Sequence, residues 1–344
     1  MIQKGLVSII ILNWNGKGVI FDCLESSLSQ GYYPREIILV DNGSTDGSLE
    51  ILREKYSSRL KIIANATNLG FAEGVNVGIK ASQGEFIALL NSDAVARNNW
   101  IEELAKAMNR SDSIGMCACK IYLADRDAVL DNTGEVICRD GIGRGRGRLE
   151  KDAGQYDSQR DVLCPSGCAA LYRRKMLDEA GWFDKHFFLY GEDIDIGLRG
   201  RLLGYQCVYV PSAIVFHKFS ASSGTVSPLK AFYVERNRLW VILKCFPLIH
   251  LLASSCYTIQ RYFYHLWGVF SRRGPASRYA RSFSPFSLLL ILVKVYLSTL
   301  WFLPYLLTQR MKIKGKSKLK WQEFECLLKS YGISPREAAL SELA

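Results

Sequence analysis

The chain has 344 residues, 49% of them hydrophobic, which is enough to bury one large core or two smaller ones. Its net charge of +11 comes from one block: residues 231–320 hold fifteen Lys and Arg and one acid, Glu235, whereas the remainder sums to −3. A block that is basic, apolar and aromatic argues against nucleic acid as a partner and favours an anionic membrane surface.

The N-terminal apolar run and the cysteines indicate the compartment. The run at 6–12 is too short for a signal peptide. The ten cysteines are scattered and show no regular disulfide or zinc-site spacing, so we expect buried or reduced thiols. Both features favour the cytosolic side.

In chain order, apolar runs predict strands over 7–12, 36–40, 60–64 and 86–90. Helical patterns lie between them, around 23–28, 49–56 and 75–79. This alternation predicts an α/β fold with a mostly parallel, doubly wound sheet. No G-x-G-x-x-G motif follows the first strand and no P-loop is present, which argues against a dinucleotide fold.

Polar residues follow two of these strands, at the sheet edge where α/β folds bind ligands. Asp41 comes after the second strand and could accept hydrogen bonds from a base or a ribose. Asn91 and Asp93 follow the fourth strand at a spacing suited to a hard cation with its phosphates. Two alternatives stay open: Asp41 fixes its own turn, and Asn91 and Asp93 cap the next helix.

The alternation of predicted strands and helices becomes weaker between residues 114 and 162. Within this segment, Gly141–Arg148 alternates glycine with three arginines and predicts a flexible basic loop, either a lid or a disordered crossing.

A second informative stretch runs from Gly181 to Asp195, where an aromatic segment leads into three acids and a helix over 196–203. The acids could simply favour the helix N-terminus. The aromatic surroundings suggest more, because an apolar pocket raises the proton affinity of a carboxylate and suits it to general-base catalysis. A strand over 205–215 then delivers His217, which could complete a cation site with Asp93.

Taken together, these motifs resemble the inverting family 2 glycosyltransferases of the GT-A fold, nearest their rhamnosyltransferase-like branch. The likeness covers roughly the first two-thirds of the chain. It is carried by five motifs in order: VSIIILNWN at 7–15, VDNGSTDGS at 40–48, NLGFA at 68–72, NSD at 91–93 and YGEDID at 190–195.

The resemblance implies a donor pocket. Asn13 and Asp41 would contact the base and ribose, and the loop from Asn68 to Gly70 would line the pocket. Asn91 stands where the family's D-x-D-type metal motif has its first Asp, which leaves one charge fewer for the cation.

The resemblance also implies the catalytic centre. Asp93 and His217 would hold Mg²⁺ or Mn²⁺, which neutralises the leaving diphosphate. Asp193 would be the catalytic base that deprotonates the acceptor hydroxyl for a single inverting displacement.

The predicted function is transfer of a sugar, rhamnose from dTDP-rhamnose, to a lipid-linked or cell-surface glycan. Another donor such as a UDP-sugar is the first alternative. A membrane-tethered, non-catalytic nucleotide-sugar or glycan-binding module is the second. A glycosidase carboxylate pair fits less well, because the metal and nucleotide motifs would then have no role. A nucleotidyltransferase would need a Gly-rich loop near the N-terminus to bind phosphate, and the sequence contains no such loop there.

The C-terminal part, 236–344, is predicted to be a helical membrane-associating region that follows a GT-A domain at 1–235. Apolar runs at 239–270 and 287–308 are interrupted by charges, and the second is long enough to span. A spanning hairpin would place four arginines outside, against the positive-inside rule. We therefore expect helices lying on the cytoplasmic leaflet, with the lysines of 312–320 on anionic headgroups.

Overall fold

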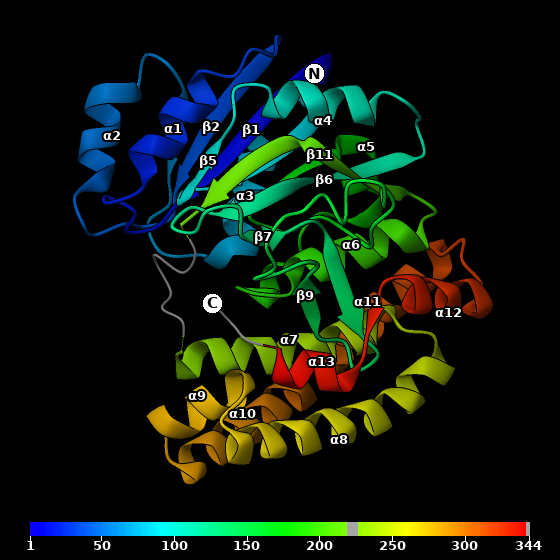
Figure 1. Cartoon of the computed structure of the whole chain (residues 1–344). Coiled ribbons are helices and arrows are strands. Elements are labelled where there is room, and N and C mark those ends of the chain that lie inside the picture. The colour runs from blue at the N-terminus through cyan, green and yellow to red at the C-terminus, as the bar shows by residue number, and fades with distance from the viewer. Residues whose placement is uncertain (219–225, 342–344) are drawn as a thin grey trace.

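The computed structural model describes residues 1–218 and 226–341. Its centre is a nine-stranded sheet in the order β3-β2-β1-β4-β10-β6-β11-β5, with β7 paired to β6 (Figure 1). The strands are β1 (Gln3–Asn13), β2 (Arg35–Asp41), β3 (Lys61–Ala64), β4 (Gly84–Asn91), β5 (Ala94–Ala96), β6 (Ile114–Leu123), β7 (Leu130–Asn132), β10 (Ala169–Arg173) and β11 (Gln206–His217).

The four strands predicted in the first ninety residues all form, and they pair in parallel around β1. The other half of the sheet is mixed. β10 runs antiparallel to both β4 and β6, and β11 is parallel to β6 but antiparallel to β5. As a result, the end of β11 arrives beside the start of β5, just after β4 has ended.

Helices cover both faces of the sheet, as expected for a doubly wound fold. Ile9 and Ile11 of β1 join a core with α1, α2 and α4, while Ile10 joins a second core with α3, α5 and α6. This split follows the alternation of side chains along a strand. The helices are α1 (Ile20–Leu28), α2 (Ser48–Tyr56), α3 (Gly70–Ala81), α4 (Trp100–Met108), α5 (Arg174–Ala180) and α6 (Glu192–Leu202).

The segment 114–162 is more ordered than its sequence pattern indicates. β8 (Glu135–Cys138) pairs with β9 (Gly143–Gly145) and with β12 (Gly332–Ile333) in a small second sheet. The expectation of a flexible loop at 141–148 is therefore wrong. Its Arg146 is held between the rings of Tyr156 and Tyr209, at 4.8 and 5.1 Å.

The C-terminal part is helical and lies beneath the sheet domain (Figure 1). α7 packs against α6, and Trp240, Ile242 and Phe246 belong to the same core as Ile10 of β1. The predicted boundary after residue 235 falls inside α7. The helices are α7 (Pro228–Cys245), α8 (Leu248–Ser271), α9 (Gly274–Ser282), α10 (Pro285–Trp301), α11 (Leu303–Lys316), α12 (Trp321–Ser330) and α13 (Pro335–Leu340).

Both predicted apolar runs are broken. The run at 239–270 divides at Pro247 between α7 and α8, and the run at 287–308 divides at Phe302 between α10 and α11. In the ranges 1–218 and 226–341, no single helix is long and apolar enough to cross a membrane. Taken together, α9 and α10 pass that test, but they are bent by 115°.

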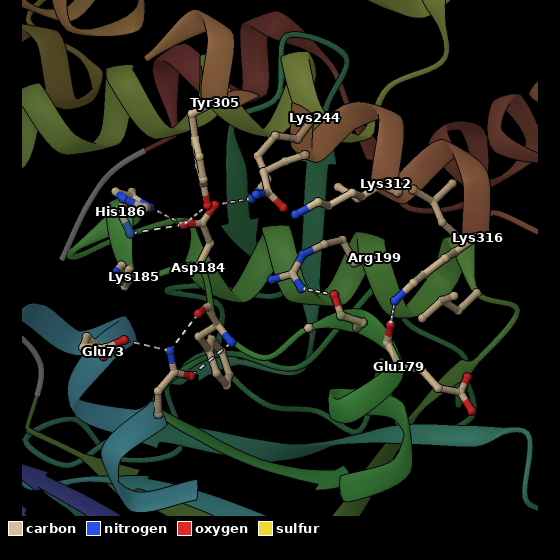
Figure 2. Close-up of a pocket in the computed structure, with 18 residues that line it drawn as sticks. Glu73, Glu179, Asp184, Lys185, His186, Arg199, Lys244, Tyr305, Lys312 and Lys316 are labelled. Carbon is tan, nitrogen blue, oxygen red and sulfur yellow. Dashed lines mark hydrogen bonds and ion pairs between the residues drawn. The ribbon is translucent and has the colours of Figure 1, made fainter. Parts of the chain in front are cut away.

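Buried ion pairs join the two parts of the chain. Lys244 of α7 lies 2.6 Å from Asp184 and 2.8 Å from Asp195, and Arg199 also pairs with Asp195 at 2.7 Å. Figure 2 shows Lys244 and Tyr305 pointing at Asp184 from the C-terminal helices. Lys244, and Arg261 through its pair with buried Asp140, therefore neutralise internal acids and are not available to a membrane.

Candidate active site

The predicted pair Asp93 and His217 does come together at the sheet edge. Asp93 directly precedes β5, and the β5–β11 register places His217 opposite Ala94. Asp93 Oδ1 lies 3.3 Å from His217 Nε2. The imidazole Nδ1 lies 2.7 Å from Oδ2 of Asp131 in β7, and Arg148 pairs with the other oxygen of Asp131.

Asp131 fixes the orientation of the His217 ring. Burial lowers the pKa of His217, but Cys168, Asp131 and Asp93 outweigh it and raise that pKa well above its usual value, so a cation bound between Nε2 and Asp93 would displace the Nε2 proton. Burial raises the pKa of Asp131, but His217 and Arg148 outweigh it and hold that pKa below its usual value. A carboxylate behind a metal-binding histidine is a recurrent arrangement that orients the ring and increases its basicity.

These residues fit a divalent cation on the chemistry of their donor set. One carboxylate oxygen and one oriented imidazole nitrogen face the same point, where Mg²⁺ or Mn²⁺ would find both ligands. The described ranges hold no cluster of three or more His, Cys, Asp or Glu side chains arranged for a metal. Phosphate oxygens and water would complete the coordination, as is common for Mg²⁺ at nucleotide sites.

Asp193 lies in the first turn of α6 and accepts two backbone hydrogen bonds. Its Oδ2 accepts from Gly167 N at 3.1 Å, and its Oδ1 accepts from Ile194 N at 2.8 Å. Burial raises the pKa of Asp193, and these donors oppose the rise. An ionised carboxylate held in partly apolar surroundings is suited to accepting a proton.

Two further acids flank Asp193, and the sequence reasoning gave neither a site role. Burial, and then the charge of Asp193, raises the pKa of Glu135 and of Glu192 to about 8 each. Near neutral pH both glutamates therefore favour their protonated forms. Glu135 lies in the poorly patterned segment, where no motif marked it.

A short segment links Asp193 to the Asp93–His217 pair. Gly167 donates to Asp193, while the neighbouring residue Cys168 accepts from Asn91 N at 2.8 Å and interacts with His217 through its thiol. Asn91 itself ends β4, as expected. The predicted base and the predicted metal ligands thus border one region of the molecule.

In the predicted donor pocket, Asn13 and Asp41 are fully buried against each other. Asn13 Nδ2 donates to Asp41 Oδ1 at 2.8 Å, and Asp41 Oδ2 accepts from Ser44 N at 3.0 Å. Asp41 therefore fixes its own turn, which was the open alternative. Its contact with a base or ribose stays a prediction.

The loop from Asn68 to Gly70 packs against the segment that precedes Asp193. Asn68 Oδ1 accepts from Gly70 N at 2.8 Å, and Phe71 N donates to Phe188 O at 2.6 Å. Gly70 has φ +81°, and a Cβ there would lie 2.5 Å from the Phe188 ring. Glycine is required at this position for both reasons.

Asn237 of α7 holds the segment before α6 in place. Its side-chain amide donates to the carbonyl oxygens of Phe187, Leu189 and Tyr190 at 3.0, 2.9 and 2.6 Å. Phe188 and Tyr190 both have positive φ, which non-glycine residues rarely adopt. The only signal in the sequence is a polar pair, Arg236–Asn237, in an aromatic helix.

Two cavities lie near this region. One, of about 250 Å³, is bordered by Asp193 and Glu135 and by four cations, Arg144, Arg148, Lys230 and Arg238. The other, of about 480 Å³, lies between α6 and α11 (Figure 2) and contains none of the predicted site residues. There Lys316 donates to the carbonyl of Glu179 at 2.9 Å, so its ammonium points to the protein and not to a headgroup.

Comparison with known proteins gives a consistent result. The model of glycosyl transferase family 2 matches residues 8–181. A glycosyltransferase of Haemophilus influenzae is 36% identical over 111 residues, which are 32% of this chain and 34% of that protein. The N-acetylglucosaminyl-diphospho-decaprenol L-rhamnosyltransferase of Mycobacterium tuberculosis is 29% identical over 56% of this chain and 69% of its own length.

Solved structures show the same fold. The mannosyltransferase PcManGT of Pyrobaculum calidifontis, in complex with GDP-Man and Mn²⁺, has a TM-score of 0.52 at 16% identity and covers 90% of this chain and 85% of its own. GalNAc-T7 with UDP, GalNAc and Mn²⁺ has a TM-score of 0.56 at 16% identity over 69% of this chain and 47% of its own. The predicted GT-A arrangement, a mostly parallel sheet with a helical C-terminal part, is confirmed.

Proposed function

Because the chain belongs to glycosyl transferase family 2, we propose that it moves a sugar from a nucleotide diphosphate donor to a glycan acceptor with inversion at the anomeric carbon. The observation that carries this proposal is the contact of Asp93 with His217, joined to Asp193 through Gly167 and Cys168. A cation site and a base on either side of one short segment suit a single displacement.

In this proposal each residue has one task. Asp193 accepts the proton of the acceptor hydroxyl while that oxygen bonds to the anomeric carbon and the bond to the donor diphosphate breaks. Asp131 keeps the His217 ring oriented toward Asp93. A bound divalent cation supplies charge neutralisation for the leaving diphosphate. No covalent intermediate between sugar and protein is needed, because the acceptor oxygen displaces the diphosphate directly.

For the donor we propose dTDP-rhamnose and for the acceptor a lipid-linked glycan. The support is the likeness to the mycobacterial protein, whose name specifies an L-rhamnosyltransferase and a diphospho-decaprenol acceptor. A UDP- or GDP-sugar is the alternative donor, because solved structures of similar fold contain UDP or GDP-Man.

A membrane surface is part of the proposal. The outer helices α8 and α10 expose many large apolar side chains, among them Phe270 at 85% and Trp301 at 83%. Exposed arginines and a lysine lie beside them: Arg272, Arg273, Arg281 and Lys294. An apolar face with a basic rim suits peripheral binding to anionic lipid, which we place on the cytoplasmic face.

The test is incubation of the full chain with a panel of dTDP-, UDP- and GDP-sugars, each with Mg²⁺, Mn²⁺ or EDTA, and with a prenyl-diphosphate-linked glycan acceptor. We expect metal-dependent release of the nucleotide diphosphate with one donor, fastest with dTDP-rhamnose. Donor binding without acceptor-dependent release from any sugar would favour the binding module instead.

A further inference from the structure

The smaller cavity beside Asp193 is lined by four cations, of which Arg238 pairs with Glu235 at 2.7 Å, and the other three come from two separate parts of the chain. Arg144 lies in β9, Arg148 follows it, and Lys230 is in the first turn of α7. All three are partly buried, and the cavity volume of about 250 Å³ suits a small group more than a whole sugar chain. We propose that this cavity binds a phosphate or diphosphate group of the acceptor.

The cations lie close enough to repel one another. Burial, and then the charge of Arg148, lowers the pKa of Lys230 to about 8. Burial and Arg148 also lower the pKa of Arg144. Like charges gathered in a partly buried cavity cost free energy, and a bound anion would recover it through charge-assisted hydrogen bonds.

Neutral groups of the chain contact two of these cations. Arg144 Nη1 donates to the carbonyl oxygen of Glu337 at 3.3 Å, and Lys230 Nζ lies 5.5 Å from the centre of the Tyr190 ring. Arg148 pairs with Asp131 behind His217. Arg144 and Lys230 are therefore the better test positions, since changing them leaves the His217 arrangement in place.

The position of the cavity assigns the phosphate to the acceptor, and this step rests on the proposed function. If Asp193 deprotonates the acceptor, the acceptor hydroxyl lies at Asp193, and a group bound between Asp193 and α7 belongs to the same molecule. Lys230 lies on α7 close to α9, whose Tyr279 hydroxyl donates to the Ser227 carbonyl at 3.2 Å. A lipid tail attached to such a phosphate could therefore continue along the outer helices with their exposed apolar side chains.

The experiment measures binding and does not depend on transfer. Full-length protein in detergent micelles is titrated with farnesyl diphosphate and with farnesol, with and without saturating dTDP and Mn²⁺. We expect wild type to bind the diphosphate more than tenfold more tightly than farnesol, and dTDP to leave that binding intact. The Arg144→Gln and Lys230→Gln changes should each weaken diphosphate binding about tenfold, as loss of one charge-assisted contact implies, and leave farnesol binding unchanged.

Arg126→Gln is the matched control, because it removes one arginine charge from an exposed loop and should alter nothing. Equal binding of farnesol and farnesyl diphosphate, or unchanged binding in both cavity variants, would overturn the proposal. So would competition by dTDP, since the phosphate site would then belong to the donor. Nucleotide release is measured on the same preparations. If farnesyl diphosphate binding depends on Arg144 but no nucleotide is released, the proposed transfer has failed and the proposed phosphate site stands.

Discussion

The Nδ1 atom of His217 lies 2.7 Å from Oδ2 of Asp131, while its Nε2 faces Asp93 at 3.3 Å. One imidazole thus connects a carboxylate that orients it with a carboxylate that would share a cation with it.

Changing Asp131 to Asn should weaken metal binding without removing a ligand. The amide oxygen can still accept from Nδ1–H, but the charge that increases the basicity of His217 is lost, and Arg148 loses its ion-pair partner. We expect the Mn²⁺ concentration for half-maximal activity to rise about 10- to 100-fold. Asp127→Asn, in an exposed loop nearby, is the control and should not shift the Mn²⁺ titration.

Changing Asn237 to Ala should impair catalysis by displacing the segment that leads into α6. The variant removes this donor from the part-buried carbonyl groups of Leu189 and Tyr190, while the Phe187 carbonyl still accepts from Arg236, at a cost of about 1–3 kcal/mol of stability. Because this segment leads into α6, we expect kcat to fall while KM for the donor changes little. Steady-state kinetics below the melting transition measures both. An equal fall in kcat for exposed Asn109→Ala would show that the effect is not specific.

Changing Lys244 to Met should destabilise the whole chain. The variant leaves buried Asp184 without its lysine and leaves Asp195 with Arg199 as its remaining cation, which costs about 3–5 kcal/mol. Urea unfolding at pH 7 measures the loss, with exposed Lys80→Met as the control. A loss below 1 kcal/mol would contradict the account of how α7 is attached.

The same pair predicts a pH dependence of stability. Burial raises the pKa of Asp184, but Lys244 outweighs it and holds that pKa well below its usual value. The stabilising contribution is therefore fully present above the unfolded pKa of about 3.9 and is lost as the pH falls through the lower folded value. Between pH 5 and pH 2, wild type should lose more stability than the Lys244→Met variant.

Glu135 predicts a change in acceptor binding on the alkaline side. The pKa of Glu135 is raised to about 8, so its carboxyl group is neutral at pH 7 and becomes charged above pH 8. The new charge lies beside Asp193 and the cavity cations. We expect KM for a phosphate-bearing acceptor to rise above pH 8 in wild type and to rise less steeply in Glu135→Gln, where only the loss of the Lys230 charge remains. Exposed Glu102→Gln should keep the wild-type profile.

The parts of the fold that were predictable are those with continuous apolar runs. β1, β2 and β4 follow such runs because both of their faces are buried, and β3, at the edge of the sheet, follows a shorter run that is only partly buried. The meeting of Asp93 with His217 followed from the rule that strand ends gather at one sheet edge.

The remainder depended on contacts between distant segments. β7, β8 and β9 are short and carry polar residues, so no periodicity marks them, and Asp131 and Glu135 went without a role. The C-terminal charge excess suggested only a membrane surface. Pairing of Lys244 with Asp184 and Asp195, and of Arg261 with Glu235, shows that part of that excess serves the interior.

The central claim is that Asp193 is the catalytic base, and the Asp193→Asn variant tests it most directly. The substitution keeps the size of the side chain and an oxygen that can accept from Gly167, but it removes proton affinity. Acceptor-dependent nucleotide diphosphate release and donor affinity are measured on the same preparation. The account predicts that release falls by at least about 100-fold while donor affinity stays within about twofold. Release at the wild-type rate would contradict it.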